Sequence, residues 1–450
     1  MMKNVLAVLM AVALLLLLTA CKKDPAGQTS GSSVAGESPN TSLKLPDLTL
    51  TNKTVKILRT MQDNHAEDEA IDLFAAKYGG SIEKILSGTG GDTLTKLSQM
   101  VLSNDAPDLV GFEGLLYFTA ISKNLFQPVN GIVDLNNPIF SAIKGSGMEN
   151  YMVGEDYYLL GAAQPRWVCW YNQKIFDDAG VDSPLKFYKE GTWTWGKLEE
   201  LAKQLTLDTN KDKTTDVYGY GDAGGVFASM LQSMNTDFVK VDNGKLVNNM
   251  NDPNLERAFA TRLRLKNAGA VYPQTAAYEA FKKGEMAMFE GGLWASSSYG
   301  FQDQVANGSM AFVPMPRDEQ SDKYYYSFFG AGYAVAEGAK NTDGTNAFLS
   351  CLWYIYNLRE SDESYAEREL NRYKADTGFT DQLLEIWNGV KTAKNVTPVI
   401  SRSEEIGGVD GWLGQMWKVA DDVLVNGKAW ATVRDQYSPI LDSEIGKIQS

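Results

Sequence analysis

The chain has 450 residues and a formal net charge of −14. This acidic balance argues against nucleic acid as a partner and against docking on anionic lipid. His65 is the one histidine in the sequence, so a zinc site or a Ser-His-Asp triad would have to be built on that residue alone.

The N-terminus has the pattern of an export signal. Lys3 precedes an uninterrupted apolar run, Val5–Leu18, which has the length of a signal-peptide core and is short for a membrane-spanning helix. The run ends in Leu18-Thr19-Ala20-Cys21, which resembles the bacterial lipobox. We therefore expect residues 1–20 to be a lipoprotein signal peptide. Cys21 would carry fatty chains such as palmitate, which anchor a protein without spanning the membrane. An ordinary signal peptide with a chance cysteine is the alternative.

The sequence after Cys21 predicts a tether followed by a folded body. Residues 21–47 are rich in Ser, Gly, Thr and Pro and show almost no apolar periodicity, so this segment cannot bury enough apolar surface to fold. Globular sequence begins near Leu48, and the remaining residues, about 400, suffice for two domains with sizeable cores. Cys169 and Cys351 lie in apolar settings, which favours two buried free thiols over a disulfide bond.

The first part of the body alternates strand and helix patterns, in the order β-α-β-α-β. This order predicts a parallel sheet covered by helices, and ligands of such sheets bind at the carboxyl ends of the strands. Asp63, Asn64 and Glu113 follow predicted strands at those ends and are candidate ligand contacts, with solvated loop residues as the alternative. The predicted elements are Val55–Leu58, Asp68–Tyr78, Ile82–Leu86, Asp92–Leu102 and Ala106–Val110.

The pattern changes after Tyr151. Residues 151–160 predict a β-hairpin around the polar Gly154-Glu155-Asp156. Trp195–Leu205 predicts a helix with Thr194 as its N-cap. Further helices are expected at Ala276–Lys283, Thr345–Leu358 and Asp410–Leu424, and short strands at Met310–Val313 and Tyr333–Val335.

Five motifs then occur in an order typical of one protein family. They are DAPDLV at 105–110, WYNQKIF at 170–176 with Ala179-Gly180, TWTWGKLEELAKQLT at 192–206, FKKGEMAMFEGGLW at 281–294 and FGAGYAV at 329–335. Together they resemble the family 1 extracellular solute-binding proteins of ABC importers, the group that includes maltose-binding protein. One departure is Gly196, which stands where the family usually has an acidic residue.

The resemblance implies an α/β fold of two lobes, the periplasmic-binding-protein-like fold of class II, with a ligand cleft between the lobes. By analogy, lobe one is residues 48–167 plus 330–400 and lobe two is residues 168–329 plus 401–450. Solute binding would close the hinge, and permease subunits of the importer would read the closed shape. The resemblance further implies a monomer on the extracytoplasmic face of the cell membrane, without enzymatic activity and without a required cofactor.

Six residues are candidate ligand contacts on the same analogy. Relatives stack a sugar ring on the tryptophan that corresponds to Trp294, and Gly292 would let the backbone approach closely. Arg166 and Trp167 lie at the expected hinge, and Tyr333 follows a glycine-rich strand. Trp412 begins a helix that reaches the cleft in relatives, with a core role as the alternative.

Oxygen-bearing side chains alternate along one polar segment, which matches the first part of an EF-hand-type calcium loop. Lys213 replaces the glycine of the sharp turn, and Gly219 stands where a bidentate glutamate is expected. A polar turn explains the pattern as well, so structural calcium is one of two interpretations. The residues are Asp208, Asn210, Asp212, Thr214 and Asp216.

The most favoured ligand is a carbohydrate, above all an oligosaccharide, because the chain has 10 Trp and 21 Tyr, and sugar faces stack on such rings. A peptide, polyamine or anion ligand is an alternative, and polyamine binding would use acidic cleft residues such as Asp63, Glu113 and Glu290. An exported glycoside hydrolase would need two carboxylates across a cleft, and acidic pairs such as Glu404-Glu405 are more simply explained as surface charge.

Overall fold

The structure is a computed structural model. Residues 1–42, which include the predicted signal peptide, Cys21 and most of the predicted tether, lie outside the part that it describes. Within the described part, no helix has the length and hydropathy needed to cross a membrane. The described residues are 43–59, 65–88, 90–112, 117–143, 148–222, 228–242, 245–274, 278–392, 396–406 and 411–449.

The chain divides into two compact units. Unit 1 consists of residues up to Gln164 together with Phe329–Tyr373, and unit 2 consists of Pro165–Phe328 together with Lys374–Ser450. The expected lobes therefore differ from the observed units mainly in residues 374–400, which belong to unit 2.

Aromatic packing explains why residues 374–400 belong to unit 2. Phe379 contacts Phe312 with ring centroids 5.1 Å apart, and Trp387, on helix α15 (Asp381–Thr392), also contacts Phe312. Phe312 lies on strand β13 (Met310–Pro314) of unit 2. The segment thus buries its large rings in the core of unit 2, which its local sequence pattern does not reveal.

The sheet of unit 1 begins with three parallel strands. β1 (Thr54–Arg59) pairs in parallel with β2 (Ser81–Leu86) and with β3 (Leu109–Phe112), which confirms the β-α-β-α-β prediction. Residues 332–335 of β14 (Tyr324–Ala336) add an antiparallel strand beside β3. The carboxyl ends of β1 and β3 therefore lie at one edge of this sheet.

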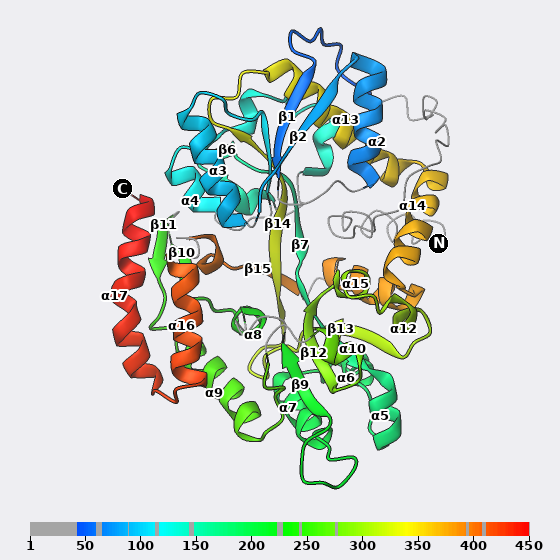
Figure 1. Ribbon diagram of the computed structural model, residues 1–450, viewed down its shortest axis with the longest axis vertical. Helices are drawn as coiled ribbons and strands as arrows, with labels where there is room; N and C mark the ends of the chain where they lie inside the picture. The colour runs from blue at the N-terminus through cyan, green and yellow to red at the C-terminus, as the bar shows by residue number, and fades with distance from the viewer. Residues whose placement is uncertain are drawn as a thin grey trace. The chain divides into compact units, whose positions relative to one another are not determined.

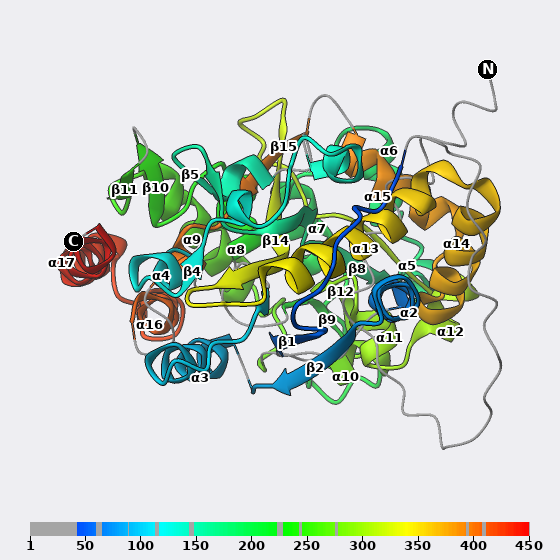
Figure 2. The ribbon, with the colours of Figure 1, turned by 90° about the horizontal axis from the view of Figure 1, so that it is seen from above.

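Helices cover the sheet of unit 1. Helix α13 (Thr342–Ser361) packs against α2 (His65–Tyr78) and β1, as the two ribbon views show (Figure 1 and Figure 2). Phe348 of α13 meets Phe74 of α2 edge to face at 5.9 Å between ring centroids. Cys351 is buried in the same helix as a free thiol.

The remaining elements of unit 1 are short, apart from two helices. The predicted hairpin is confirmed as β5 and β6, which pair Met152 with Tyr157. The elements are α3 (Gly90–Leu102), α4 (Tyr117–Ser122), β4 (Phe126–Gln127), η2 (Val129–Gly131), η3 (Pro138–Ile143), η4 (Met148–Tyr151), β5 (Met152–Val153), β6 (Asp156–Tyr157), β7 (Leu160–Pro165) and α14 (Glu363–Thr377), the last two of which cross into unit 2 at their ends.

The sheet of unit 2 has the strand order β13-β8-β12-β9. β8 (Trp167–Asn172) is antiparallel to both β13 and β12 (Met286–Gly292), and β9 (Tyr218–Asp222) is parallel to β12. All seven residues of β12 are buried, as expected for a central strand with both faces covered. Cys169 of β8 is a buried free thiol, and burial raises its pKa.

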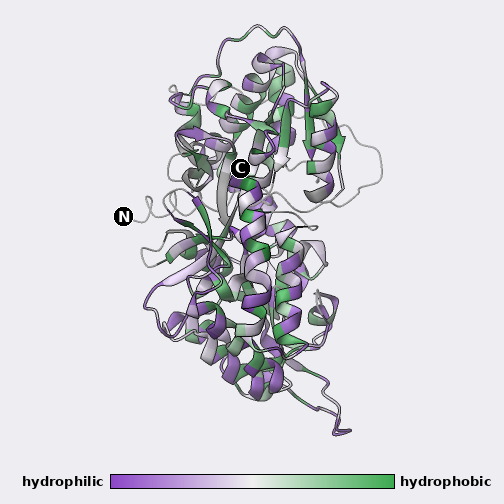
Figure 3. Ribbon diagram, turned by 90° about the vertical axis from the view of Figure 1, so that its left-hand side faces the viewer, coloured by the Kyte–Doolittle hydropathy of each residue, from purple (hydrophilic) through white to green (hydrophobic). Residues whose placement is uncertain are grey.

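The other elements of unit 2 are helices and short strands. α17 ends near the C mark in Figure 3 and carries hydrophilic and hydrophobic residues along its length; it buries Trp430, Val433, Tyr437, Leu441 and Ile445 on one face. The elements are α5 (Gln173–Ala179), α6 (Pro184–Lys189), α7 (Trp195–Gln204), α8 (Ala228–Ser233), β10 (Val239–Asp242), β11 (Lys245–Asn248), α9 (Pro253–Asn267), α10 (Tyr278–Lys282), α11 (Ala295–Ser298), α12 (Gln302–Ala306), β15 (Val396–Ile400), η5 (Ser403–Glu405), α16 (Trp412–Leu424) and α17 (Trp430–Gln449).

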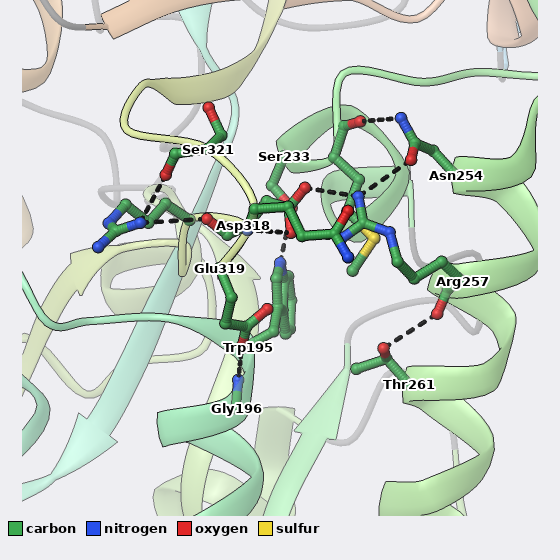
Figure 4. Close-up of polar contacts among 12 residues, drawn as sticks. Trp195, Gly196, Ser233, Asn254, Arg257, Thr261, Asp318, Glu319 and Ser321 are labelled. Carbon is green, nitrogen blue, oxygen red and sulfur yellow. Dashed lines mark hydrogen bonds and ion pairs between the residues drawn. The ribbon is translucent and has the colours of Figure 1, made fainter.

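The start of α7 explains the unusual Gly196. Thr194 caps the helix by accepting a hydrogen bond from the Lys197 backbone N–H at 3.3 Å, as predicted. The backbone N–H of Gly196 donates to the carboxylate of Glu319, which lies in the loop after β13 (Figure 4). Glu319 thus supplies, from a distant segment, a negative charge at the N-terminal end of α7.

The same loop is fixed to α9. Arg257 donates to both carboxylate oxygens of Asp318, with 2.6 Å from Nη2 to Oδ2, and also to Asn254 at 3.0 Å (Figure 4). Such a bidentate pair defines the geometry of both partners. The loop therefore presents Glu319 to α7 in a defined position.

Replacing Glu319 with alanine should lower the free energy of unfolding by about 1 kcal/mol, because the first turn of α7 loses a charged acceptor. Urea denaturation at low ionic strength measures this change. The exposed Asp322 of the same loop provides the control, because Asp322→Ala removes the same charge. Equal effects of the two substitutions would contradict the proposed role of Glu319.

Candidate functional site

One edge of the sheet in unit 2 brings together two residues that are far apart in the sequence. In the antiparallel pairing of β8 and β12, Trp167 lies opposite Gly292 and Val168 lies opposite Gly291. β8 starts at this edge and β12 ends there. The chain leaves β12 through a turn to Trp294, so the two predicted tryptophans meet.

Trp167 and Trp294 form a pair of rings with centroids 5.6 Å apart and planes tilted by 52°. Both side chains are only half-buried. A Cβ atom on Gly292 would lie 2.0 Å from the Trp294 ring, so this ring rests directly on the glycine backbone. The missing side chain of Gly292 thus leaves the space that the Trp294 ring occupies, and its role in ligand contact stays a prediction.

Two other side chains hold Gly292 in place. The indole N–H of Trp170 donates to the Gly292 carbonyl oxygen at 3.0 Å. The Tyr278 hydroxyl oxygen accepts a hydrogen bond from the Gly292 backbone N–H, and burial raises the pKa of Tyr278, which therefore stays a neutral phenol. Tyr278 in turn stacks on Tyr299 with 4.0 Å between ring centroids. The turn that carries Trp294 is thus preorganised by buried hydrogen bonds.

Arg166 places a positively charged guanidinium group beside the tryptophan pair. Its guanidinium carbon lies 4.8 Å from the centre of the Trp167 ring, within the range of a cation–π contact. Nη1 also forms an ion pair with Oε2 of Glu404, and the two side chains are 18% and 11% exposed. Here the structure corrects the interpretation of Glu404 and Glu405 as surface charge, since both are buried.

A buried carboxylate anchors the turn that carries Glu404. Asp237 accepts hydrogen bonds from the Ser401 hydroxyl and the Ser403 backbone N–H, each at 3.1 Å, and from the Ser403 hydroxyl. Burial raises the pKa of Asp237 to about 6, and the nearby Glu404 carboxylate acts in the same direction. The turn is thereby fixed to the start of β10.

A second buried carboxylate, Glu290, lies two residues before Gly292 on β12. It accepts hydrogen bonds from the Tyr220 hydroxyl at 2.7 Å and from the Ser229 hydroxyl, and it is 3% exposed. Arg262 lies over the Tyr220 ring at 5.2 Å. Glu290 therefore supports the sheet edge through its neighbours and offers little surface to a solute.

Two predicted contacts lie in protein cores. Trp412 is fully buried and meets Phe238 edge to face at 5.8 Å between ring centroids, which fits its alternative role as a core residue. Tyr333 is 4% exposed within unit 1 and donates its hydroxyl hydrogen to Glu67, which also pairs with Arg59 at 3.0 Å. In this arrangement neither ring presents a face to a solute.

Asp63, Asn64 and Glu113 lie outside the described residues, so their predicted ligand contacts stay predictions. The backbone of α2 starts at His65.

The predicted calcium loop uses its oxygens for internal hydrogen bonds. Asp208 accepts from the backbone N–H of Lys213 at 2.8 Å, and Asn210 accepts from that of Asp212 at 2.8 Å. Asp216 accepts from Thr209, and Thr214 donates its backbone N–H to Asp212. In the described part of the chain, no three His, Cys, Asp or Glu side chains are grouped to hold a metal ion. Calcium binding by this loop stays an untested prediction.

Comparison with known proteins identifies the family. Residues 69–354 match the family model described as bacterial extracellular solute-binding protein. The chain belongs to this family. A comparison of this solute-binding protein with curated proteins gives no match. The family predicted from the five sequence motifs is thus confirmed.

Solved structures support the predicted two-lobed α/β fold. The galacto-N-biose-/lacto-N-biose I-binding protein of an ABC transporter from Bifidobacterium longum has a TM-score of 0.66 at 14% identity, covering 88% of this chain and 98% of that one. The maltose/maltodextrin-binding domain MalE from Bdellovibrio bacteriovorus, bound to maltotriose, has a TM-score of 0.60 at 17% identity. That match covers 87% of this chain and 99% of the other. UgpB from Mycobacterium tuberculosis, in complex with glycerophosphocholine, has a TM-score of 0.63 at 15% identity. That match covers 88% of this chain and 99% of the other.

Replacing Gly292 with alanine should displace the Trp294 ring, because the new Cβ atom would overlap it. We expect a changed near-ultraviolet circular dichroism signal and a loss of roughly 1–3 kcal/mol in unfolding free energy. Gly446→Ala is the matched control, since a Cβ atom at this position in α17 meets no atom within 4 Å. It should stabilise slightly. An unchanged aromatic signal in Gly292→Ala would contradict the observed packing.

The raised pKa of Asp237 predicts a pH-dependent stability. The folded state binds this proton more tightly than the unfolded state, so the stabilising contribution is complete below about pH 4 and is lost as the pH rises through about 6. The unfolding free energy of the wild type minus that of Asp237→Asn should therefore fall between pH 4 and 7, by roughly 3 kcal/mol at most. Chemical denaturation across this range measures the difference. A difference that stays constant with pH would refute the assignment.

Proposed function

We propose that the protein is a lipid-anchored, extracytoplasmic solute-binding protein that captures a carbohydrate, above all an oligosaccharide, and delivers it to an ABC importer. The observation that carries the proposal is the half-buried pair of Trp167 and Trp294 beside the Arg166–Glu404 ion pair. The family match supports an extracytoplasmic binding role. The anchor would be Cys21, and release to the importer would follow the hinge closure that the family resemblance implies.

The chemistry of the pair suits a sugar ring. One face of a pyranose consists of C–H groups, which pack against an aromatic ring, while the hydroxyl groups at its edge need donors and acceptors. Arg166 supplies donors and Glu404 supplies an acceptor beside the same rings. Because Gly292 and its partners fix the turn before the ligand arrives, little ordering of the rings would oppose binding.

The described part of unit 2 supports a carbohydrate over a polyamine. A polyamine site needs carboxylates that can pair with the ammonium groups of the ligand and are not already paired within the protein. Here Glu404 pairs with Arg166, and Glu405 pairs with Arg402 at 2.9 Å. Glu290 is buried under two hydroxyl donors. The acidic residues of this edge are therefore already compensated.

A thermal-shift screen of the mature chain tests the ligand class. The panel is maltotriose, maltotetraose, lacto-N-biose, glycerophosphocholine, spermidine and a tripeptide. A ligand at a hundredfold excess over its dissociation constant stabilises the folded state by roughly 2.7 kcal/mol, so at least one saccharide should raise the melting temperature. A shift with spermidine, the peptide or glycerophosphocholine alone would refute the carbohydrate proposal, and turnover of a chromogenic glycoside would refute the non-enzymatic one.

The Trp294→Ala variant tests the site. It should abolish the saccharide-induced shift, because the ring that packs against the sugar is removed, and it should keep a cooperative melting transition. Trp417→Ala is the matched control, since Trp417 is 56% exposed on α16 and should retain full binding. Isothermal titration calorimetry with the best saccharide measures both. Retained affinity in Trp294→Ala would place the ligand elsewhere.

A further inference from the structure

Trp167 carries one of the two rings of the candidate site, yet its side chain lacks a polar anchor. Its indole N–H is buried and, among the residues that the structure describes, has no hydrogen-bond partner. The ring contacts Trp294 and the Arg166 guanidinium by aromatic and cation–π packing, and such packing accepts a range of ring orientations. The orientation of the ring therefore depends on how the Trp167 backbone is held.

The Trp167 backbone lies where β8 loses one of its two neighbouring strands. On one side, β12 still pairs with Trp167 through Gly292. On the other side, the pairing with β13 ends one residue earlier, where Pro314 lies opposite Val168. Backbone groups in a protein interior need a hydrogen-bond partner, so the end of a strand pairing calls for a substitute.

A tyrosine side chain takes the place of the missing strand. The Tyr326 hydroxyl donates to the Trp167 carbonyl oxygen, and its oxygen accepts from the backbone N–H of Met315, the first residue after β13. Tyr326 is 2% exposed, and burial raises its pKa, so the hydroxyl stays neutral and keeps the hydrogen that it donates. One hydroxyl group thus bridges the end of β13 and the start of β8.

Tyr326 is itself held in place by a strand. It lies on β14, whose residues 324–328 pair in parallel with β15, with Tyr326 opposite Pro398. The next residue, Ser327, accepts a hydrogen bond from the Arg166 backbone N–H at 2.9 Å. Two adjacent residues of β14 therefore hold the two adjacent residues that lead into β8.

We propose that Tyr326 is a positioning residue for ligand binding, whose hydroxyl group fixes the Trp167 backbone so that the ring is presented to the solute in one orientation. This inference rests on the proposed function, since it concerns a ring of the same site. Tyr326 acts through Trp167, because its own hydroxyl is used by backbone groups. Without that hydroxyl, the Trp167 carbonyl would be left buried without this donor, and the backbone would shift toward another one.

Tyr326→Phe tests the inference, because it removes one oxygen atom and keeps the ring. We expect roughly fivefold to tenfold weaker saccharide binding, the effect of one lost hydrogen bond. Isothermal titration calorimetry of the mature chain with maltotriose, maltotetraose and lacto-N-biose measures it. The tryptophan band of the near-ultraviolet circular dichroism spectrum should also change, since it reports ring packing, while urea unfolding stays cooperative.

The chain offers a matched control in the same strand. Tyr324 lies two residues before Tyr326, on the same face of β14. It is 9% exposed, and its buried hydroxyl has no hydrogen-bond partner in the described part of the chain. Tyr324→Phe removes the same atom and the same chromophore, so it should leave saccharide affinity and the tryptophan band unchanged. Equal effects of the two substitutions would overturn the inference.

A rescue variant separates positioning from packing. Incorporation of 4-aminophenylalanine at position 326 keeps an N–H donor at the same point of the ring, and it should restore the tryptophan band and most of the affinity. A folded rescue variant that behaves like Tyr326→Phe would contradict the role of the donor. A lower urea midpoint in Tyr326→Phe, with band and affinity unchanged, would show a purely structural role and overturn the inference.

The spectroscopic measurement needs no ligand, so the two proposals can fail separately. A changed tryptophan band in Tyr326→Phe, with no saccharide bound by the wild type, would leave Tyr326 as the residue that positions Trp167 and refute the carbohydrate function. Saccharide binding by the wild type, with band and affinity unchanged in Tyr326→Phe, would leave the function and refute the role of Tyr326.

Discussion

The antiparallel pairing of β8 with β12 is the constraint on which the candidate site depends. This register sets Trp167 opposite Gly292, and the missing side chain of Gly292 leaves the space that the Trp294 ring fills. A shift of one residue would turn each side chain of β8 to the other face of the sheet and separate the rings. Hydrogen bonds from Trp170 and to Tyr278 hold the glycine at that register. The aromatic surface is therefore a property of the sheet, and it exists before any solute arrives.

The charged side chains beside the tryptophan rings influence which solutes can bind there. The ion pair of Arg166 and Glu404 places donors and an acceptor at the edge of the rings. Half-buried charges of this kind are stable only when each has its partner. Asp237 anchors the 401–405 turn through hydrogen bonds, so the Glu404 side chain is held close to Arg166. The combination supports the proposal of a solute with a ring and hydroxyl groups, and the chain belongs to a family of extracellular solute-binding proteins.

Features with a local pattern could be predicted from the sequence. The parallel strands β1, β2 and β3, the hairpin of β5 and β6 and the Thr194 cap each rest on neighbouring residues. The motif at 281–294 also predicted Trp294 and Gly292 as candidate site residues. Contacts between distant segments could not be predicted in this way. Nothing near Glu404 indicates Arg166 as its partner, although the alternation of Ser401, Arg402 and Ser403 before two glutamates is a weak signal for a polar turn. The place of residues 374–400 likewise depends on rings that meet Phe312 only after folding.

The central claim is that a carbohydrate packs against the tryptophan pair of unit 2. A crystal structure of the mature chain, grown with the saccharide that gives the largest thermal shift, tests it most directly. We expect a sugar ring stacked on Trp294 or Trp167 with its ring centre roughly 4–5 Å from the indole, and a hydroxyl group within hydrogen-bond distance of Arg166 or Glu404. A saccharide bound in full occupancy away from both tryptophans would contradict it.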